Sequence, residues 1–262
     1  MSRELDKQLK LLGKKEYKIL NKKENKLFKE KVEPVMDKIQ SKIPEKLMST
    51  LESAFFQGFK LVFEKGHLYI DKTYNKERLK LEYYLNNHAV DKKMSSRHIK
   101  RLDKQAGKSQ KMNSFISVVE GGILGVLGIG LPDIPIFISV IIKNIHEIAY
   151  SYGYNPETEA EKAYILLLIC GAMTKGRKQR EYNEEIDLLG KKIDQHCYTE
   201  TELEKQMRET ANVLSEAMLT AKFIQGFAIV GVVGGLVNYS IIKKIGEYSS
   251  LKYKKRYLNK KA

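Results

Sequence analysis

The chain has 262 residues, of which 42% are hydrophobic and 30% are charged, and its formal net charge is +15. This apolar content excludes an intrinsically disordered protein, and the length fits one large domain or two small ones. The only two cysteines, Cys170 and Cys197, exclude a disulfide framework and fit a reducing compartment. The basic N-terminus lacks the apolar core of a secretory signal, so we expect a cytoplasmic protein.

The positive charge is concentrated at the two ends of the chain. Residues 1–31 carry eleven Lys or Arg against five acids, a net of +6, and residues 243–262 carry eight against one, a net of +7. Basic segments of this kind bind anionic lipid headgroups or nucleic acid phosphates. We find no base-reading module and expect no basic stripe in the body of the chain, so we do not expect a nucleic acid partner.

In chain order, the first predicted element is a basic amphipathic helix over residues 3–29, where leucines recur at helical spacing among lysines. We assign residues 1–33 to this N-terminal helix and residues 34–262 to the main helical domain. A second helix is predicted to begin near Pro44, which suits a first-turn position, and to end at Gly66. Residues 67–75 are predicted to be a loop or short extended piece, and residues 76–88 return to a helical pattern.

Further along the chain, Asn155, Pro156 and Glu157 resemble a cap, a first-turn proline and a first-turn acid, which predicts another helix start. No alternating apolar pattern of any length indicates a strand. We therefore predict an all-α fold, a multi-helix bundle that includes two glycine-rich apolar helical segments.

These two segments are residues 115–142 and residues 223–242. The first is interrupted by Pro132 and Pro135, so neither half is long enough to cross a bilayer. The second has no ionisable residue across 20 positions and could span, but its Gln225 and Asn238 fit the innermost helix of a soluble bundle equally well. Small residues let helix backbones approach closely. The glycines expected to make such helix contacts are Gly122, Gly125, Gly128, Gly231 and Gly235.

One order of motifs resembles a known family. A glycine-rich apolar run is followed by Leu131-Pro132-Asp133-Ile134-Pro135, then Ile145-His146-Glu147-Ile148-Ala149 and Tyr152-Gly153-Tyr154-Asn155, and later by Val230 to Asn238 and a basic helix through Tyr257. This order is similar to the EcsC protein family of bacteria, over about residues 45–260. The resemblance implies a mostly helical protein. The family is named after a gene that lies beside genes for an ATP-driven transporter. The resemblance implies no settled activity and supplies no catalytic residues.

The sequence contains no complete catalytic or metal-binding motif. His146-Glu147 begins a zinc-protease pattern, but Tyr150 stands where the second histidine is required, and we expect no metal and no cofactor. Asp133 lies between two prolines at the end of an apolar run, where it either caps the following helix or faces a polar cleft. The candidate polar cleft consists of Asp133, Lys143, His146 and Glu147.

The leading hypothesis is a non-enzymatic, membrane-associated helical protein at the inner face of the cell membrane. Its expected partners are an anionic membrane surface and a membrane protein such as a transporter, and its oligomeric state stays open. The basic C-terminal helix supplies the predicted lipid-binding residues Lys252, Lys254, Lys255 and Arg256. The alternative is a soluble, hydrolase-like enzyme that uses Asp133, His146 and Glu147 as acid and base groups.

Overall fold

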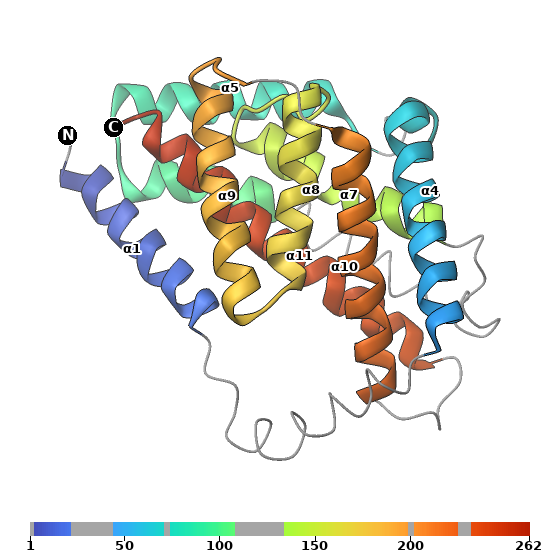
Figure 1. The fold of residues 1–262 in the computed structure, drawn as a ribbon. Coiled ribbons are helices and arrows are strands. Elements are labelled where there is room, and N and C mark those ends of the chain that lie inside the picture. Colours follow the sequence, from blue (N-terminus) through green and yellow to red (C-terminus); the bar gives the residue numbers. More distant parts are fainter. Residues whose placement is uncertain (1–2, 22–43, 71–73, 108–133, 199–201, 225–231) are drawn as a thin grey trace.

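The structure is a computed structural model that describes residues 3–21, 44–70, 74–107, 134–198, 202–224 and 232–262 (Figure 1). All regular elements in these ranges are helices, which confirms the predicted all-α fold. They are α1 (Arg3–Leu20), α4 (Glu45–Tyr69), α5 (Lys76–Lys92), a helix over residues 96–107, α7 (Ile134–Ser151), α8 (Glu159–Met173), α9 (Gly176–Asp194), α10 (Leu203–Ile224) and α11 (Val232–Asn259).

The helices pack around a shared apolar core. In Figure 1, α9, α8, α10 and α4 lie side by side, α11 crosses behind them, and α1 lies along one edge. The central helix α8 is buried on almost every side, from Ala163 to Ala172. Such a helix is hydrophobic all round, as expected where other helices surround it. The core is therefore built mainly on α7, α8 and α11, and the N-terminal helix packs against it from outside.

Local capping explains where two of the helices begin. The side chain of Asn75 accepts a hydrogen bond from the backbone N–H of Arg78 and starts α5. Thr158 caps α8 in the same way, by accepting from the N–H of Glu161. The sequence placed this start at Asn155, which was wrong by three residues because Asn155 instead accepts from the N–H of Glu157 and closes a turn.

The predicted end of the second helix also differs from the structure. Helix α4 continues to Tyr69 across a kink at Lys65, whose backbone has non-helical angles of φ −118° and ψ 19°. Gly66 follows directly, and the sequence predicts the end of the helix there because glycine often ends helices. Here the chain bends one residue earlier and then resumes its helical turn, so the loop predicted from residue 67 begins later.

The glycine-rich segments are described only in part. Gly122, Gly125, Gly128 and Gly231 lie outside the described residues, whereas Gly235 belongs to α11. The described part of the second segment is divided between the end of α10 and the start of α11, where Val237, Ile241 and Ile242 are buried in the core. Among the described helices, only α7 is long and apolar enough to cross a membrane, and 67% of it is buried inside the protein.

Candidate functional site

The C-terminal cations that the sequence assigned to lipid point into the protein. The Lys252 side chain is fully buried, with Nζ 2.5 Å from a Glu16 carboxylate oxygen and 2.8 Å from an Asp187 oxygen. Lys255 contacts the same two acids at 2.8 and 2.7 Å. Glu16 belongs to α1 and Asp187 to α9, so this cluster of four charges joins three helices. We call it the lysine cluster.

Arg256 forms a second internal charge network one turn further along α11. Its guanidinium group lies 2.8 Å from Glu161 and 2.7 Å from Asp194, and its Cζ atom is 4.2 Å from the centre of the Tyr154 ring and 4.4 Å from that of Tyr164. Burial alone would lower the pKa of Arg256, but the two acids raise it above its ordinary value. The charge is therefore held inside the protein by acids and aromatic faces.

The four predicted lipid-binding residues are all engaged in contacts inside the protein. Lys254 is also paired, 2.8 Å from Asp103. All four cations thus have intramolecular acidic partners and do not form a free basic face. A lipid headgroup could reach Lys252 or Arg256, which are 0% and 5% exposed, only by displacing a buried partner. Lipid binding by these four residues stays a prediction that the geometry does not favour.

The described residues of the predicted polar cleft belong to α7 and are buried or half-buried. Asp133 lies outside the described residues, Lys143 is half-buried, and His146 and Glu147 are only 8% and 9% exposed on α7. The His146 Nδ1 atom is 3.4 Å from the Tyr74 hydroxyl. Burial lowers the pKa of His146 to about 4, so the imidazole is neutral near pH 7. His146 and Glu147 are therefore buried polar residues of α7, and the imidazole carries no charge near pH 7.

The N-terminal helix presents its cations outward instead. Its buried positions are Leu5, Gln8, Leu12 and Glu16, at spacings of three and four residues, so they form one face against the core. The opposite side carries the exposed residues Leu11 and Tyr17. It also carries six exposed cations, none of which forms an ion pair with a described acid: Arg3, Lys7, Lys10, Lys14, Lys15 and Lys18.

A second outward basic face follows α5. In the helix over residues 96–107, Ile99, Leu102 and Ala106 are buried, and Asp103 points inward to Lys254. The exposed positions are all basic, at spacings i, i+3, i+4 and i+7, and none is paired with a described acid: Arg97, Lys100, Arg101 and Lys104. The expectation that the body has no basic stripe was therefore wrong, although this spacing was visible in the sequence.

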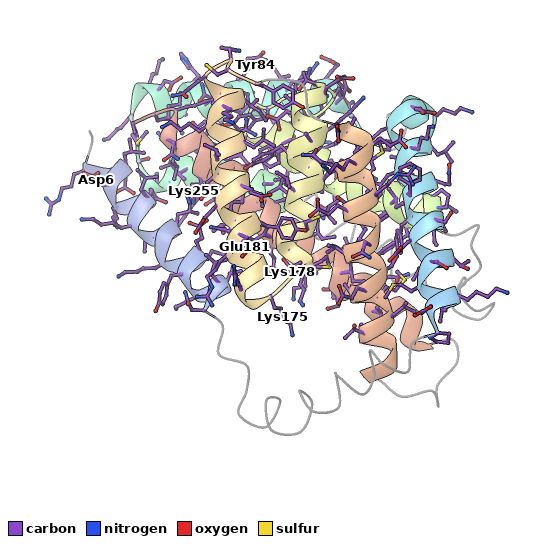
Figure 2. The ribbon with its side chains drawn as sticks, viewed as in Figure 1. Asp6, Tyr84, Lys175, Lys178, Glu181 and Lys255 are labelled. Carbon is purple, nitrogen blue, oxygen red and sulfur yellow. The ribbon has the colours of Figure 1, made fainter. Side chains whose placement is uncertain are left out.

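The two basic faces belong to neighbouring helices. Ser96 is the first residue of the 96–107 helix, and its hydroxyl group donates a hydrogen bond to the Glu4 carboxylate of α1. The Gln8 side-chain amide of α1 donates to the Ser96 hydroxyl oxygen at 3.2 Å. These contacts join the beginning of α1 to the beginning of the 96–107 helix. We call the ten outward cations of these two helices the basic surface. In Figure 2 the α1 part projects side chains away from the molecule around the labelled Asp6.

Two observations bear on metal or thiol chemistry. Among the described residues, no group of three or more His, Cys, Asp and Glu side chains could hold a metal ion. Cys170 is buried, and burial raises the pKa of its thiol to about 12, which keeps it protonated and unreactive near pH 7. Cys197 is exposed.

The fold and the site define an all-helical protein with a paired, inward-facing C-terminal charge network and an outward-facing basic surface. Comparison with known families agrees with the motifs noted above, because the model of the EcsC protein family matches residues 6–258. The chain belongs to the EcsC protein family. The match begins inside α1, so the similarity extends further than the expected residues 45–260. No curated protein and no solved structure gives a significant match.

Proposed function

We propose that this chain is a non-enzymatic peripheral membrane protein, held at the inner face of the cell membrane by anionic lipid headgroups. The observation that carries the proposal is the basic surface, whose ten cations are exposed and make no ion pair with a described acid. Each lysine or arginine close to an anionic bilayer contributes roughly 1 kcal/mol of binding free energy. Several such side chains acting together give binding that salt weakens.

Exposed apolar side chains on α1 make lipid a better fit to this surface than nucleic acid. Two apolar or amphipathic side chains stand among its cations, Leu11 at 52% exposure and Tyr17 at 68%. A helix with a basic polar face and exposed Leu or Tyr matches the boundary between headgroups and acyl chains. The family is named after a gene that lies beside genes for a transporter, which suggests a membrane protein as an additional partner. Binding to lipid does not depend on that partner.

The direct test is sedimentation of the full chain with vesicles. We expect binding to vesicles of phosphatidylcholine and phosphatidylglycerol, little binding to phosphatidylcholine alone, and release at high salt. A triple variant of α1, with Lys7→Gln, Lys10→Gln and Lys14→Gln, should bind on the order of 100-fold more weakly.

A matched triple variant controls for net charge. It carries Lys46→Gln, Lys60→Gln and Lys65→Gln, three exposed lysines of α4 on the far side of the molecule from α1 (Figure 1). Equal loss of binding in the two variants would show that net charge, and not the basic surface, binds the vesicle. If duplex DNA at equal phosphate concentration strips the protein from anionic vesicles, the basic surface is a nucleic acid site and the lipid proposal fails.

A further inference from the structure

Helix α5 carries an exposed apolar stripe that the core does not use. Leu81, Tyr84 and Leu85 are 60%, 66% and 66% exposed, and their spacing of i, i+3 and i+4 places them on one face. Figure 2 shows Tyr84 at the outer edge of the molecule, along α5. Single exposed apolar residues are common, but three on one helical face form a local patch.

The charges around this stripe are arranged so that no acid of α5 is left unpaired. Glu77 lies 3.2 Å from Lys80, and Glu82 lies 2.9 Å from Arg78. The third acid, Asp91, pairs with Lys261 of the C-terminus. The stripe therefore meets no isolated negative charge on its own helix that would repel an anionic surface.

The 96–107 helix, with its outward basic face, packs against α5, the helix that carries the stripe. Gln105 donates to the backbone carbonyl of Leu79 at 3.1 Å, and Asn86 donates to the Gln105 side chain at 3.1 Å. These bonds, with the short connection after Lys92, pair α5 and the 96–107 helix as an antiparallel hairpin. Lys104 and Arg101 accordingly lie at about the level of Tyr84 and Leu85 along the hairpin axis, and Lys100 and Arg97 lie further towards the turn.

We propose that this hairpin is the part of the protein that enters the bilayer interface. Leu81, Tyr84 and Leu85 reach the boundary between headgroups and acyl chains, while the neighbouring cations contact lipid phosphates. The inference rests on the proposed membrane function and adds the inserted element to it. The hairpin cations at phosphate level are Lys92, Lys93, Arg97, Lys100, Arg101 and Lys104.

Charge complementarity decides between a bilayer and other occupants of the stripe. An anionic bilayer offers a continuous negative plane beside a shallow apolar layer, which matches a short apolar stripe next to a basic one. A stable protein interface uses roughly 20–30 residues on each side, more than this stripe provides. A second copy of the chain would also bring the same cations against each other, which is repulsive.

The chain contains no tryptophan, so a single introduced tryptophan reports on one position. We would place it in the full chain as Tyr84→Trp, with Leu47→Trp as the control because Leu47 is 44% exposed and belongs to α4, on the opposite side of the molecule from α1 (Figure 1). With anionic vesicles, the Tyr84→Trp emission should shift to shorter wavelength and be quenched by lipids brominated near the headgroup. The Leu47→Trp emission should change little.

The outcomes separate the two proposals when sedimentation is measured on the same samples. If the protein binds vesicles but the Tyr84→Trp emission does not move, docking by α1 stands and insertion of the hairpin is wrong. If nothing binds, both proposals fail. A blue shift that depends on protein concentration without vesicles would assign the stripe to self-association and overturn the inference.

A second variant tests insertion without a reporter. Leu81→Ser with Leu85→Ser should weaken binding to anionic vesicles on the order of tenfold, because these exposed side chains contribute little to the core but bury apolar area in lipid. Unchanged binding in a folded double variant would contradict insertion. Folding is checked by its helical circular dichroism and cooperative unfolding.

Discussion

The two basic ends of this chain use their charge in opposite ways. Helix α1 buries leucines and one acid and turns its lysines to solvent, whereas α11 turns Lys252 and Arg256 into the protein, where acids of other helices neutralise them. The net charges of the two ends differ by only one unit, +6 and +7. Charge counting therefore identifies a basic segment, and the position of its apolar residues decides whether the charge is available to a partner.

The lysine cluster connects these two uses of charge. Glu16 is the buried acid of α1, and it accepts hydrogen bonds from both Lys252 and Lys255 of α11. The C-terminal cations thus fix the N-terminal helix in the orientation that exposes its own cations. Loss of the inward pairs should affect stability, while loss of the outward cations should affect binding alone.

The largest effect is expected at Arg256. Replacing it as Arg256→Met removes the buried partner of Glu161 and should lower the free energy of unfolding by about 3–5 kcal/mol, measured by urea denaturation. The control is Arg177→Met, which removes an exposed pair with Glu181 on α9 and should change stability by about 0.5 kcal/mol or less. Similar values for both variants would contradict the contrast between inward and outward charge.

The next largest effect is expected at His146, a histidine that burial keeps neutral near pH 7. Its pKa in the folded protein is about 4, below the ordinary value of 6.5, so the unfolded chain binds the proton more readily. Stability should fall by up to about 3 kcal/mol as the pH drops from 6.5 towards 4. His146→Gln should flatten this part of the stability profile. An unchanged profile would place the acid sensitivity elsewhere.

A smaller effect is expected at Glu16. Burial raises the pKa of Glu16, but Lys252 and Lys255 outweigh it and bring the pKa below the ordinary value of 4.5. The ionised acid therefore stabilises the protein above that pH, and its contribution disappears as the pH falls through the lowered pKa. Glu16→Gln should cost about 2 kcal/mol near pH 7 and much less in acid, whereas exposed Glu184→Gln should cost little.

The smallest effect on stability is expected for the α1 triple variant described above. Its three lysines are exposed and unpaired within the described part of the chain, so their replacement should change the free energy of unfolding by about 0.5 kcal/mol or less. Denaturation of this variant beside the wild type would verify that any loss of vesicle binding is not loss of fold. A large destabilisation would mean that these side chains take part in packing.

The helical fold could be predicted from the sequence because its signals are local. Leucine spacing identified α1, few prolines interrupt the chain, and the family motifs were readable. Helix ends were less accurate, since Asn155 and Thr158 both suit a cap, and it is Thr158 that accepts from the first turn of α8 while Asn155 closes the turn before it.

The candidate site was harder to predict because it depends on contacts between distant segments. The partners of Lys252 are 236 and 65 residues away in sequence, so no local pattern shows that this lysine is buried. The basic stripe from Arg97 to Lys104 did have a local signal, the i, i+3, i+4 and i+7 spacing. It was missed because the net charge of the residues between the two basic ends was considered as a sum. That sum is near neutral even though one helix face within it is strongly basic.

Cell fractionation tests the central claim, that the outward cations of α1 hold this protein at the membrane. Full chains of the wild type and the α1 triple variant are expressed in bacteria, and membranes are washed with high salt and then with alkaline carbonate. We expect wild-type protein in the membrane fraction, from which salt releases it, and the triple variant in the cytosol. Wild-type protein that is cytosolic from the start, or that resists both washes, would contradict it.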